Sequence, residues 1–371
     1  MNRKRIVATL GYCGACISFY IGAGFATMQE VAQYEASYGS AFPLVIIVAA
    51  SIYIYTNISF ATNGCRYDVK RGGEIYRIYC SALGKDIGGI LAKFFDYFSA
   101  LFCYMSFVVM CGGANSTFVQ QWGIASGMGA IILTFLVIIT VLLGLNGILQ
   151  TLGKIGPVII IMILFISIVT AISGRTDFLG NLQEIDTGKY VGIMEQVGNG
   201  NPFASGASYG GFVILWFASF LAETGGKNPI KDVNIGMLLS ALFIFGTSTL
   251  CCIALIGHVD IIAASDIPAL VLANQISPIV SILFALIIFL GIYTSATPLL
   301  WTAIRKIADE GTITYKISTV IAGSVGCGIA CFVPYKGLIN ILYGINGYLG
   351  FILMVIMIFH DLEIIRKKKA Q

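Results

Sequence analysis

The sequence predicts an all-α polytopic membrane protein with ten transmembrane helices, and three observations lead to this prediction. Of the 371 residues, 57% are hydrophobic and 11% are charged, whereas soluble domains carry about 25% charged residues. Ten apolar stretches each approach the roughly 20 residues that a helix needs to cross a bilayer. The Lys and Arg residues follow the positive-inside rule over the segments between these stretches.

The apolar stretches form two groups of five within one transmembrane domain that covers 1–371. Residues 7–173 would hold the first five spans, and residues 203–360 would hold the second five. The polar segment 174–202 would be an outer loop, and the outer loop at 258–278 is expected to contain a short helix over the outer mouth. The spans are expected at about 7–28, 41–63, 90–112, 127–147, 155–173, 203–225, 235–257, 279–302, 317–333 and 338–360.

The distribution of basic residues predicts the orientation. With the N-terminus in the cytoplasm, only Arg175, Lys189 and Lys336 of the 22 Lys and Arg residues fall in outer segments. Cytoplasmic segments of membrane proteins carry the excess of positive charge. We therefore expect both termini in the cytoplasm and the chain in the plasma membrane of a bacterium.

The first span contains a break signal at residues 20–30, whose sequence is YIGAGFATMQE. In lipid, backbone groups must be hydrogen-bonded internally, so a broken helix is tolerated where it lines an enclosed cavity. The glycines followed by polar residues therefore predict a binding site at membrane depth. The candidate substrate-binding residues are Ile21, Gly22, Ala23, Gly24 and Phe25, and Gln29 and Glu30 are candidates to line the pathway.

A second segment of small residues, 205–212, lies in span six, five spans after the first. An odd number of spans per half inverts the second half relative to the first, which is typical of many secondary transporters. We therefore expect spans one and six both to be broken; the alternative is that both glycine sets serve close helix packing. The substrate-binding candidates here are Tyr209, Gly210, Gly211 and Phe212, and Tyr104 in span three is a further candidate.

Two other segments suggest how transport would be coupled to an ion. Span eight contains Thr294 and Ser295, whose hydroxyl oxygens suit a hard cation such as Na⁺, although such side chains also bond back to their own helix. Lys154 begins span five. Its ammonium would either reach the inner interface or, if desolvated, carry a coupling proton. The freed N–H and C=O groups of a broken helix would suit the two charges of a zwitterionic amino acid.

At these residues the chain resembles the amino acid–polyamine–organocation (APC) superfamily, and more closely the YkvI-like amino acid permeases of Gram-positive bacteria. The resemblance rests on residues 22–26 with Gln29 and Glu30 in span one, and on residues 209–212 in span six. The segment 223–229 is similar to the Glu-x-x-Lys-Asn-Pro loop of broader amino acid permeases, with one extra residue. The resemblance implies a LeuT-like fold, a 5+5 inverted repeat with helices 1 and 6 broken, and amino acid transport.

The resemblance also implies where a coupling ion would bind. In sodium-coupled relatives the ion is held by carbonyls of span one and by a Thr-Ser pair of span eight. Some proton-coupled relatives place a lysine of span five there instead, which leaves Lys154 as the proton alternative. Carried over residue by residue, the ion ligands would be the carbonyls of Ser18, Ile21 and Gly291 and the hydroxyls of Thr294 and Ser295.

The hypothesis from the sequence is a secondary active transporter of amino acids or related small amines, coupled to Na⁺ or H⁺ and working by alternating access. The alternative is a transport-inactive ligand sensor or receptor subunit on the same fold. An enzyme is not expected, because the sequence holds no nucleophile–base set and no P-loop. We expect no catalytic residue, no metal site and no cofactor, with Na⁺ as the candidate coupling ion. The expected partners are a small-molecule substrate and the lipid bilayer, not nucleic acid, and the oligomeric state is left open.

Overall fold

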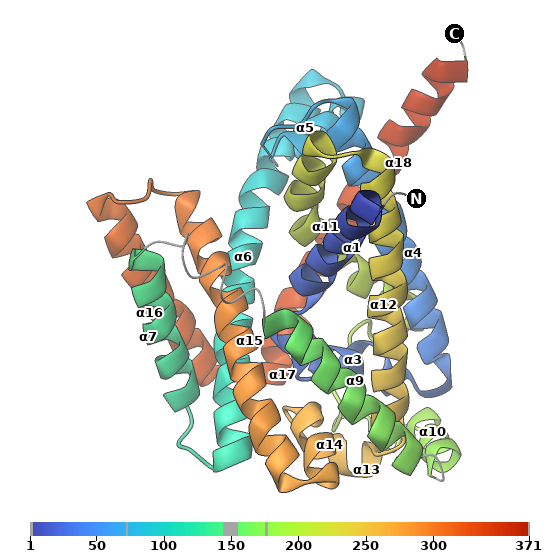
Figure 1. Ribbon diagram of the computed structural model, residues 1–371, viewed down its shortest axis with the longest axis vertical. Coiled ribbons are helices and arrows are strands. Elements are labelled where there is room, and N and C mark those ends of the chain that lie inside the picture. The colour runs from blue at the N-terminus through green and yellow to red at the C-terminus, as the bar shows by residue number, and fades with distance from the viewer. Residues whose placement is uncertain (1–2, 72, 144–154, 175–176, 370–371) are drawn as a thin grey trace.

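The structure is a computed structural model that describes residues 3–71, 73–143, 155–174 and 177–369. Within these ranges every regular element is helical (Figure 1). The first half contains α1 (Arg3–Tyr20), α2 (Ala23–Ala26), α3 (Gln29–Tyr34), η1 (Ala36–Ala41), α4 (Phe42–Arg66), α5 (Glu74–Cys80), η2 (Ser81–Leu83), α6 (Lys85–Trp122), α7 (Met128–Leu143) and α9 (Ile155–Ser173). The second half contains α10 (Phe178–Asp186), α11 (Pro202–Lys227), α12 (Ile230–Ile256), α13 (Val259–Ile262), α14 (Pro268–Ile276), α15 (Pro278–Arg305), α16 (Ile313–Phe332), α17 (Tyr335–Leu338), η4 (Ile339–Tyr343) and α18 (Gly344–Lys369).

Long apolar helices confirm a multi-pass membrane protein. Seven described helices are long and apolar enough to cross a membrane, and the bent pair α9–α10 would be an eighth if it is one span. The first and fourth predicted spans hold shorter apolar helices, Arg5–Ile17 and Met128–Leu143. Residues 144–147 of the fourth span lie outside the described residues. The count of ten spans and the inverted relation of the two halves therefore stay predictions.

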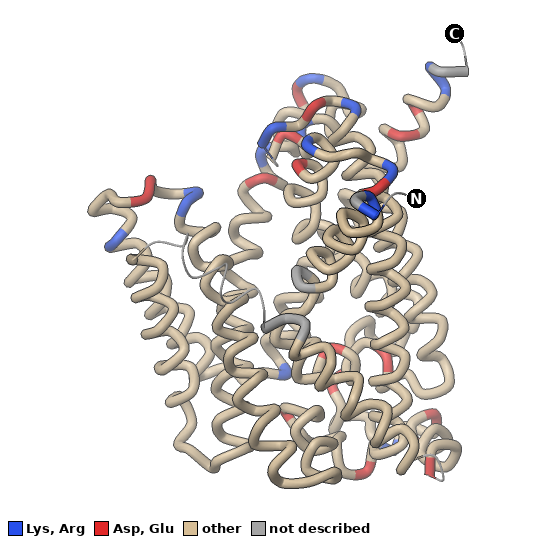
Figure 2. The backbone as a smooth tube through the Cα atoms, viewed as in Figure 1, with Lys and Arg blue, Asp and Glu red and all other residues tan. Residues whose placement is uncertain are grey.

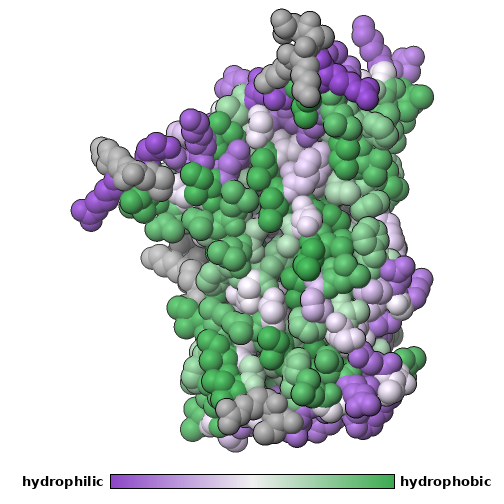
Figure 3. All heavy atoms as spheres, turned by 90° about the vertical axis from the view of Figure 1, so that its right-hand side faces the viewer, coloured by the Kyte–Doolittle hydropathy of each residue, from purple (hydrophilic) through white to green (hydrophobic). Residues whose placement is uncertain are grey.

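The surface is divided as a bilayer requires. Lys and Arg gather at the end of the molecule that holds both termini and α5, which we name the terminal end (Figure 2). Between the two polar ends, apolar side chains cover the surface (Figure 3). Large side chains such as Ile90, Leu242 and Phe332 are exposed there, at 70%, 74% and 89%. Exposed apolar surface of this extent suits contact with lipid chains and not with water.

Local signals in the sequence set the helix starts. Asn201 precedes Pro202, and its side-chain oxygen accepts hydrogen bonds from the backbone N–H groups of Phe203 and Ala204 at the start of α11. Ser277 and Pro278 begin α15 in the same way. A capping side chain followed by proline satisfies free N–H groups and fixes the first helical turn. The segment 258–278, which was predicted to be an outer loop with a short helix, holds the short helices α13 and α14.

The first span is interrupted, whereas the sixth is not. α1 ends at Tyr20 and α2 begins at Ala23. By contrast, α11 is one continuous helix over the whole of span six, so the break expected there is not found. The reason is that its glycines serve close packing. A Cβ added to Gly210 would lie 2.7 Å from Cβ of Ile52 in α4, and one added to Gly211 would overlap the backbone of Gly347 in α18. Small residues at such positions let two helix backbones approach.

Candidate functional site

The interruption of the first span has two parts. Gly22 is extended, with φ −102° and ψ −173°, and separates α1 from the single turn of α2. Met28 then takes a left-handed conformation, with φ 59°, before α3 begins. A non-glycine residue at positive φ is uncommon and is held in place by its surroundings. The chain therefore changes direction twice within a few residues, and both turns are buried.

Other elements complete the hydrogen bonds of this interruption. The backbone carbonyl of Thr27 accepts a hydrogen bond from the N–H of Ala269 in α14 at 3.1 Å. The Thr27 hydroxyl lies 3.1 Å from that of Tyr335 in α17. A backbone group freed from a helix at membrane depth must find such a partner. α14 and α17 thus hold the interruption from the side away from the termini (Figure 1).

Glu30 folds back into this interruption. Its carboxylate lies directly against Gly24, where a Cβ would overlap it, and is close to the backbone N–H of Phe25. The residue is 2% exposed, and its Oε2 atom has no hydrogen-bond partner within the described part of the chain. A buried polar atom without a partner is costly and points to a missing ligand, ion or water.

A second buried carboxylate, Glu35, lies near enough for its charge to act on Glu30. Its Oε1 accepts a hydrogen bond of 2.6 Å from the Ser248 hydroxyl in α12, and its Oε2 has no partner among the described residues. No Lys or Arg side chain of the described ranges forms an ion pair with either glutamate. Two uncompensated carboxylates at membrane depth mark a functional site by default.

Aromatic side chains from several helices surround Glu30. Tyr20 of α1 packs edge-on against Phe25, with ring centroids 5.6 Å apart. Tyr34 of α3 stacks on Tyr209 of α11 at 4.7 Å. Further along α11, Phe212 stacks on Tyr343 of η4 at 4.8 Å and 7°. The charge of Glu30 acts on the hydroxyls of Tyr20, Tyr34, Tyr209, Tyr335 and Tyr343.

Two residues of the tenth span reach this aromatic group through an irregular stretch of helix. Ile339–Tyr343 forms a π-helical turn, a feature that often occurs at functional sites. The Tyr343 hydroxyl is buried without a hydrogen-bond partner among the described residues and lies 3.9 Å from the position that a Cβ on Gly22 would take. Asn346 donates from Nδ2 to the carbonyl of Phe212, and its Oδ1 is likewise without a partner there.

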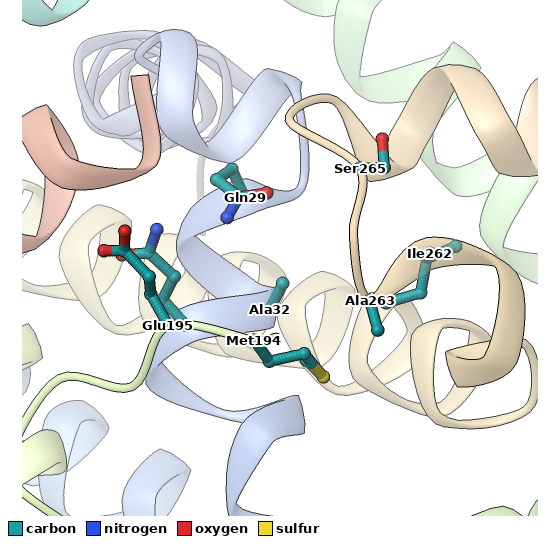
Figure 4. A pocket seen from close by; sticks show the side chains of 8 residues that line it. Gln29, Ala32, Met194, Glu195, Ile262, Ala263 and Ser265 are labelled. Atoms are coloured by element: carbon teal, nitrogen blue, oxygen red, sulfur yellow. The ribbon is translucent and has the colours of Figure 1, made fainter. Parts of the chain in front are cut away.

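A small pocket lies beside the site, on the side away from the termini. Figure 4 shows Gln29 and Ala32 of α3 with Met194 and Glu195 beside them, and Ile262, Ala263 and Ser265 on the other side. Gln33 also lines it. Gln29 is 3% exposed, so this face is nearly closed. Gln29, which was predicted to line the pathway, therefore borders this pocket.

The structure brings together some of the predicted substrate-binding residues. Ile21 and Gly22 lie in the break, Ala23, Gly24 and Phe25 form α2, and Tyr209 and Phe212 join the aromatic group. The other three lie elsewhere. Gly210 and Gly211 pack against α4 and α18, and the Tyr104 hydroxyl donates to the carbonyl of Ala322 in α16 at 3.0 Å. The hydroxyl is the only polar group of the Tyr104 side chain, so Tyr104 faces α16.

The predicted ion ligands remain a prediction. The Thr294 hydroxyl donates to the carbonyl of Gly291 in its own helix at 2.8 Å, and Gly291 packs against Ile159 of α9. Ser295 is half-buried. Ile21 lies in the break and bonds back to Ile17 through its N–H at 3.1 Å. The side chain of Ser18 is not among those described, and Lys154 lies outside the described residues.

Several members of this site were not predicted from the sequence. Glu35 and Tyr34 follow the expected end of span one, where a polar stretch resembles an ordinary loop. Tyr343 and Asn346 are single polar residues in a span whose glycines gave no break signal. The spacing of Glu30 and Glu35, two acidic residues in a segment without a basic one, is the signal that was available.

Comparisons with known proteins give little further guidance. No protein-family model matches the chain, and no curated protein matches it. One similar solved structure is a mutant of the manganese transporter of Eremococcus coleocola. The two chains share 14% sequence identity, and they superpose with a TM-score of 0.49. The match covers 94% of this chain and 78% of the manganese transporter chain. A likeness of this size does not say what this chain binds.

Proposed function

We propose that this chain is a secondary transporter that carries an amino acid or a related small amine by alternating access. The observation that supports it most is the interrupted first span, into which Glu30 folds at membrane depth. A plain membrane anchor would gain nothing from an extended Gly22, a left-handed Met28 and an unpaired buried carboxylate. In a transporter these features provide polar groups for a ligand in the middle of the bilayer.

The coupling ion would be H⁺ or Na⁺. The buried, unpaired oxygens of Glu30 and Glu35 support a proton, since a carboxylate without a cation partner is least costly when protonated. The hydroxyls of Thr294 and Ser295 support Na⁺, because a cation could replace the hydrogen bond from the Thr294 hydroxyl to the Gly291 carbonyl. We place the terminal end in the cytoplasm, because Lys and Arg gather there (Figure 2).

Uptake into proteoliposomes tests this function. The purified chain is reconstituted, and uptake of radiolabelled amino acids and amines is followed with an inward proton gradient, with an inward Na⁺ gradient, and with neither. Saturable uptake that depends on one gradient would support the proposal. Binding without uptake under every gradient would favour the receptor alternative, and the absence of both would refute the proposed ligand class.

A further inference from the structure

We infer that the ligand of this site is an organic amine cation without an α-carboxylate, because Glu30 already provides the carboxylate at the break. The inference rests on the proposed function and narrows its substrate class from amino acids and amines to amines alone. Three features of the described residues support it: the place that Glu30 occupies, the charge that the site lacks, and the hydrogen-bonding character of its free atoms.

The first feature is the place of Glu30. A zwitterionic amino acid needs room for its carboxylate beside the free backbone N–H groups of the break. In this chain the carboxylate of Glu30 fills the space beside Gly24 and lies close to the N–H of Phe25. A ligand carboxylate would meet the same volume, and the Glu30 carboxylate would repel it whenever Glu30 is ionised. The site is therefore occupied at the position where an amino acid would bind its acid group.

The second feature is the missing positive charge. Glu30 and Glu35 are both at most 2% exposed, and neither forms an ion pair with a basic side chain of the described chain. Among the described Lys and Arg residues Lys336 is the buried one, and its Nζ donates to the carbonyl of Ala263. The tyrosines that face Glu30 carry no charge to compensate it. A ligand ammonium would supply the compensation that a buried carboxylate needs.

The third feature is the character of the free atoms. The unpaired buried oxygens of Glu30, Glu35 and Asn346 are carboxylate or amide oxygens. The Oε1 atoms of Gln29 and Gln33, at the adjoining pocket, are unpaired as well. Such oxygens accept hydrogen bonds, and an ammonium group offers up to three donors and no acceptor. The unpaired hydroxyls of Tyr34, Tyr209 and Tyr343 can donate as well as accept. A ligand carboxylate could use only such hydroxyls, whereas an ammonium could donate to the hydroxyl, carboxylate and amide oxygens alike.

The aromatic rings agree with this choice. Four aromatic rings pack against one another around the break, those of Tyr20, Tyr209, Phe212 and Tyr343. The face of an aromatic ring attracts a cation, and the attraction increases when the cation is desolvated. A buried group of rings around a carboxylate is thus suited to an organic cation, with the apolar part of the ligand against the rings.

Matched pairs of ligands test the inference. Binding to the purified full-length protein is measured for four amines and for the amino acids from which each differs only by the carboxylate: agmatine and arginine, cadaverine and lysine, histamine and histidine, tyramine and tyrosine. We expect at least one amine to bind at least about tenfold more tightly than its amino acid. This ratio is the lower end of what one charged hydrogen bond contributes.

Glu30→Gln should reverse this preference. The variant should bind the amine about 10- to 100-fold more weakly, since it loses a charged hydrogen bond. Its affinity for the parent amino acid should rise, a gain that a misfolded protein cannot show. Glu30→Asp, which keeps the charge but shortens the side chain, should give an intermediate ratio. Asp361→Asn is the matched control, because it removes another carboxylate that bonds Ser59 and Asn63 in a different part of the fold.

The outcomes separate the two proposals. If the wild type binds an amino acid as tightly as its amine, or Glu30→Gln leaves the ratio unchanged, the inference is wrong while the transporter proposal stands. If neither amines nor amino acids bind the wild type, the inference falls together with the proposed substrate class. If the Glu30 variants do not fold, the wild-type comparison of the matched pairs decides alone.

Discussion

Gly24→Ala should act on the site through Glu30. The added methyl group would overlap the Glu30 carboxylate, so that carboxylate must leave its place beside the N–H of Phe25. Separating a buried carboxylate from a nearby backbone N–H costs roughly 1.5–3 kcal/mol, the range for a hydrogen bond to a charged group. Replacing a helical glycine by alanine gains about 0.5–1 kcal/mol in return. We therefore expect a net loss of about 0.5–2.5 kcal/mol in the free energy of unfolding, together with weaker ligand binding.

A double-mutant cycle isolates this effect. In the Glu30→Ala background there is no carboxylate to displace, so Gly24→Ala should no longer be destabilising. The coupling free energy between the two positions should be roughly 1.5–3 kcal/mol. Equilibrium unfolding of the four proteins in mixed detergent micelles gives this quantity, and amine binding to the same samples gives its counterpart for the ligand.

Gly22→Ala is the control from the same break. Its added Cβ would meet the terminal methyl of Met110 at 3.2 Å, which can move, and the extended backbone of Gly22 accepts alanine. This variant should keep its stability, with or without Glu30. If Gly24→Ala has the same effect with and without Glu30, the glutamate does not occupy the space beside Gly24. That space would then be free for a ligand carboxylate, contrary to the inference of an amine ligand.

Three further changes follow from the structure. Replacing both Thr294 and Ser295 by Ala should abolish any Na⁺ stimulation of uptake, and stimulation that survives would place the ion site elsewhere. Gly211→Val should destabilise the protein by about 1–3 kcal/mol, the usual cost of overpacking, because it pushes α11 from α18, whereas Gly246→Val, in open space, should melt as the wild type does. Ser248→Ala should cost about 1–3 kcal/mol, since it leaves a buried carboxylate oxygen unpaired; an unchanged melting temperature would mean that water replaces the hydroxyl.

The first span is interrupted at Gly22, where the sequence signal lies, but the same signal in span six lies within a continuous helix. In span one, Gly22 and Gly24 are followed by polar residues, and the polar groups have no place in a plain lipid-facing helix. In span six, Gly210 and Gly211 carry the same signal but face Ile52 and the tenth span. Packing partners so distant in the sequence cannot be read from a local pattern, so a packing glycine and a breaking glycine are indistinguishable there.

Glu30 was predicted to line a pathway, but its position was not predictable. The side chain reaches Gly24 because the left-handed Met28 reverses the chain between them. That conformation is rare for methionine, and no propensity indicates it. The absence of an ion pair at Glu30 and Glu35 was not predictable either, because the residues that surround them are known only once the neighbouring helices are placed.

The unbroken course of α11 changes how such a protein would move. Of the two helices expected to be broken, only the first provides a backbone hinge. α11 contacts α4 and α18 through glycines that leave no clearance, so these three helices would turn as one rigid body. The site would then open and close as α1 rotates about Gly22. α12 would move with α1, because Gly236 of α12 packs closely against α1. The side of the ligand site formed by α11 would stay fixed through the transport cycle. Any difference in ligand affinity between the two sides of the membrane would then come from the moving side, α1 with α12.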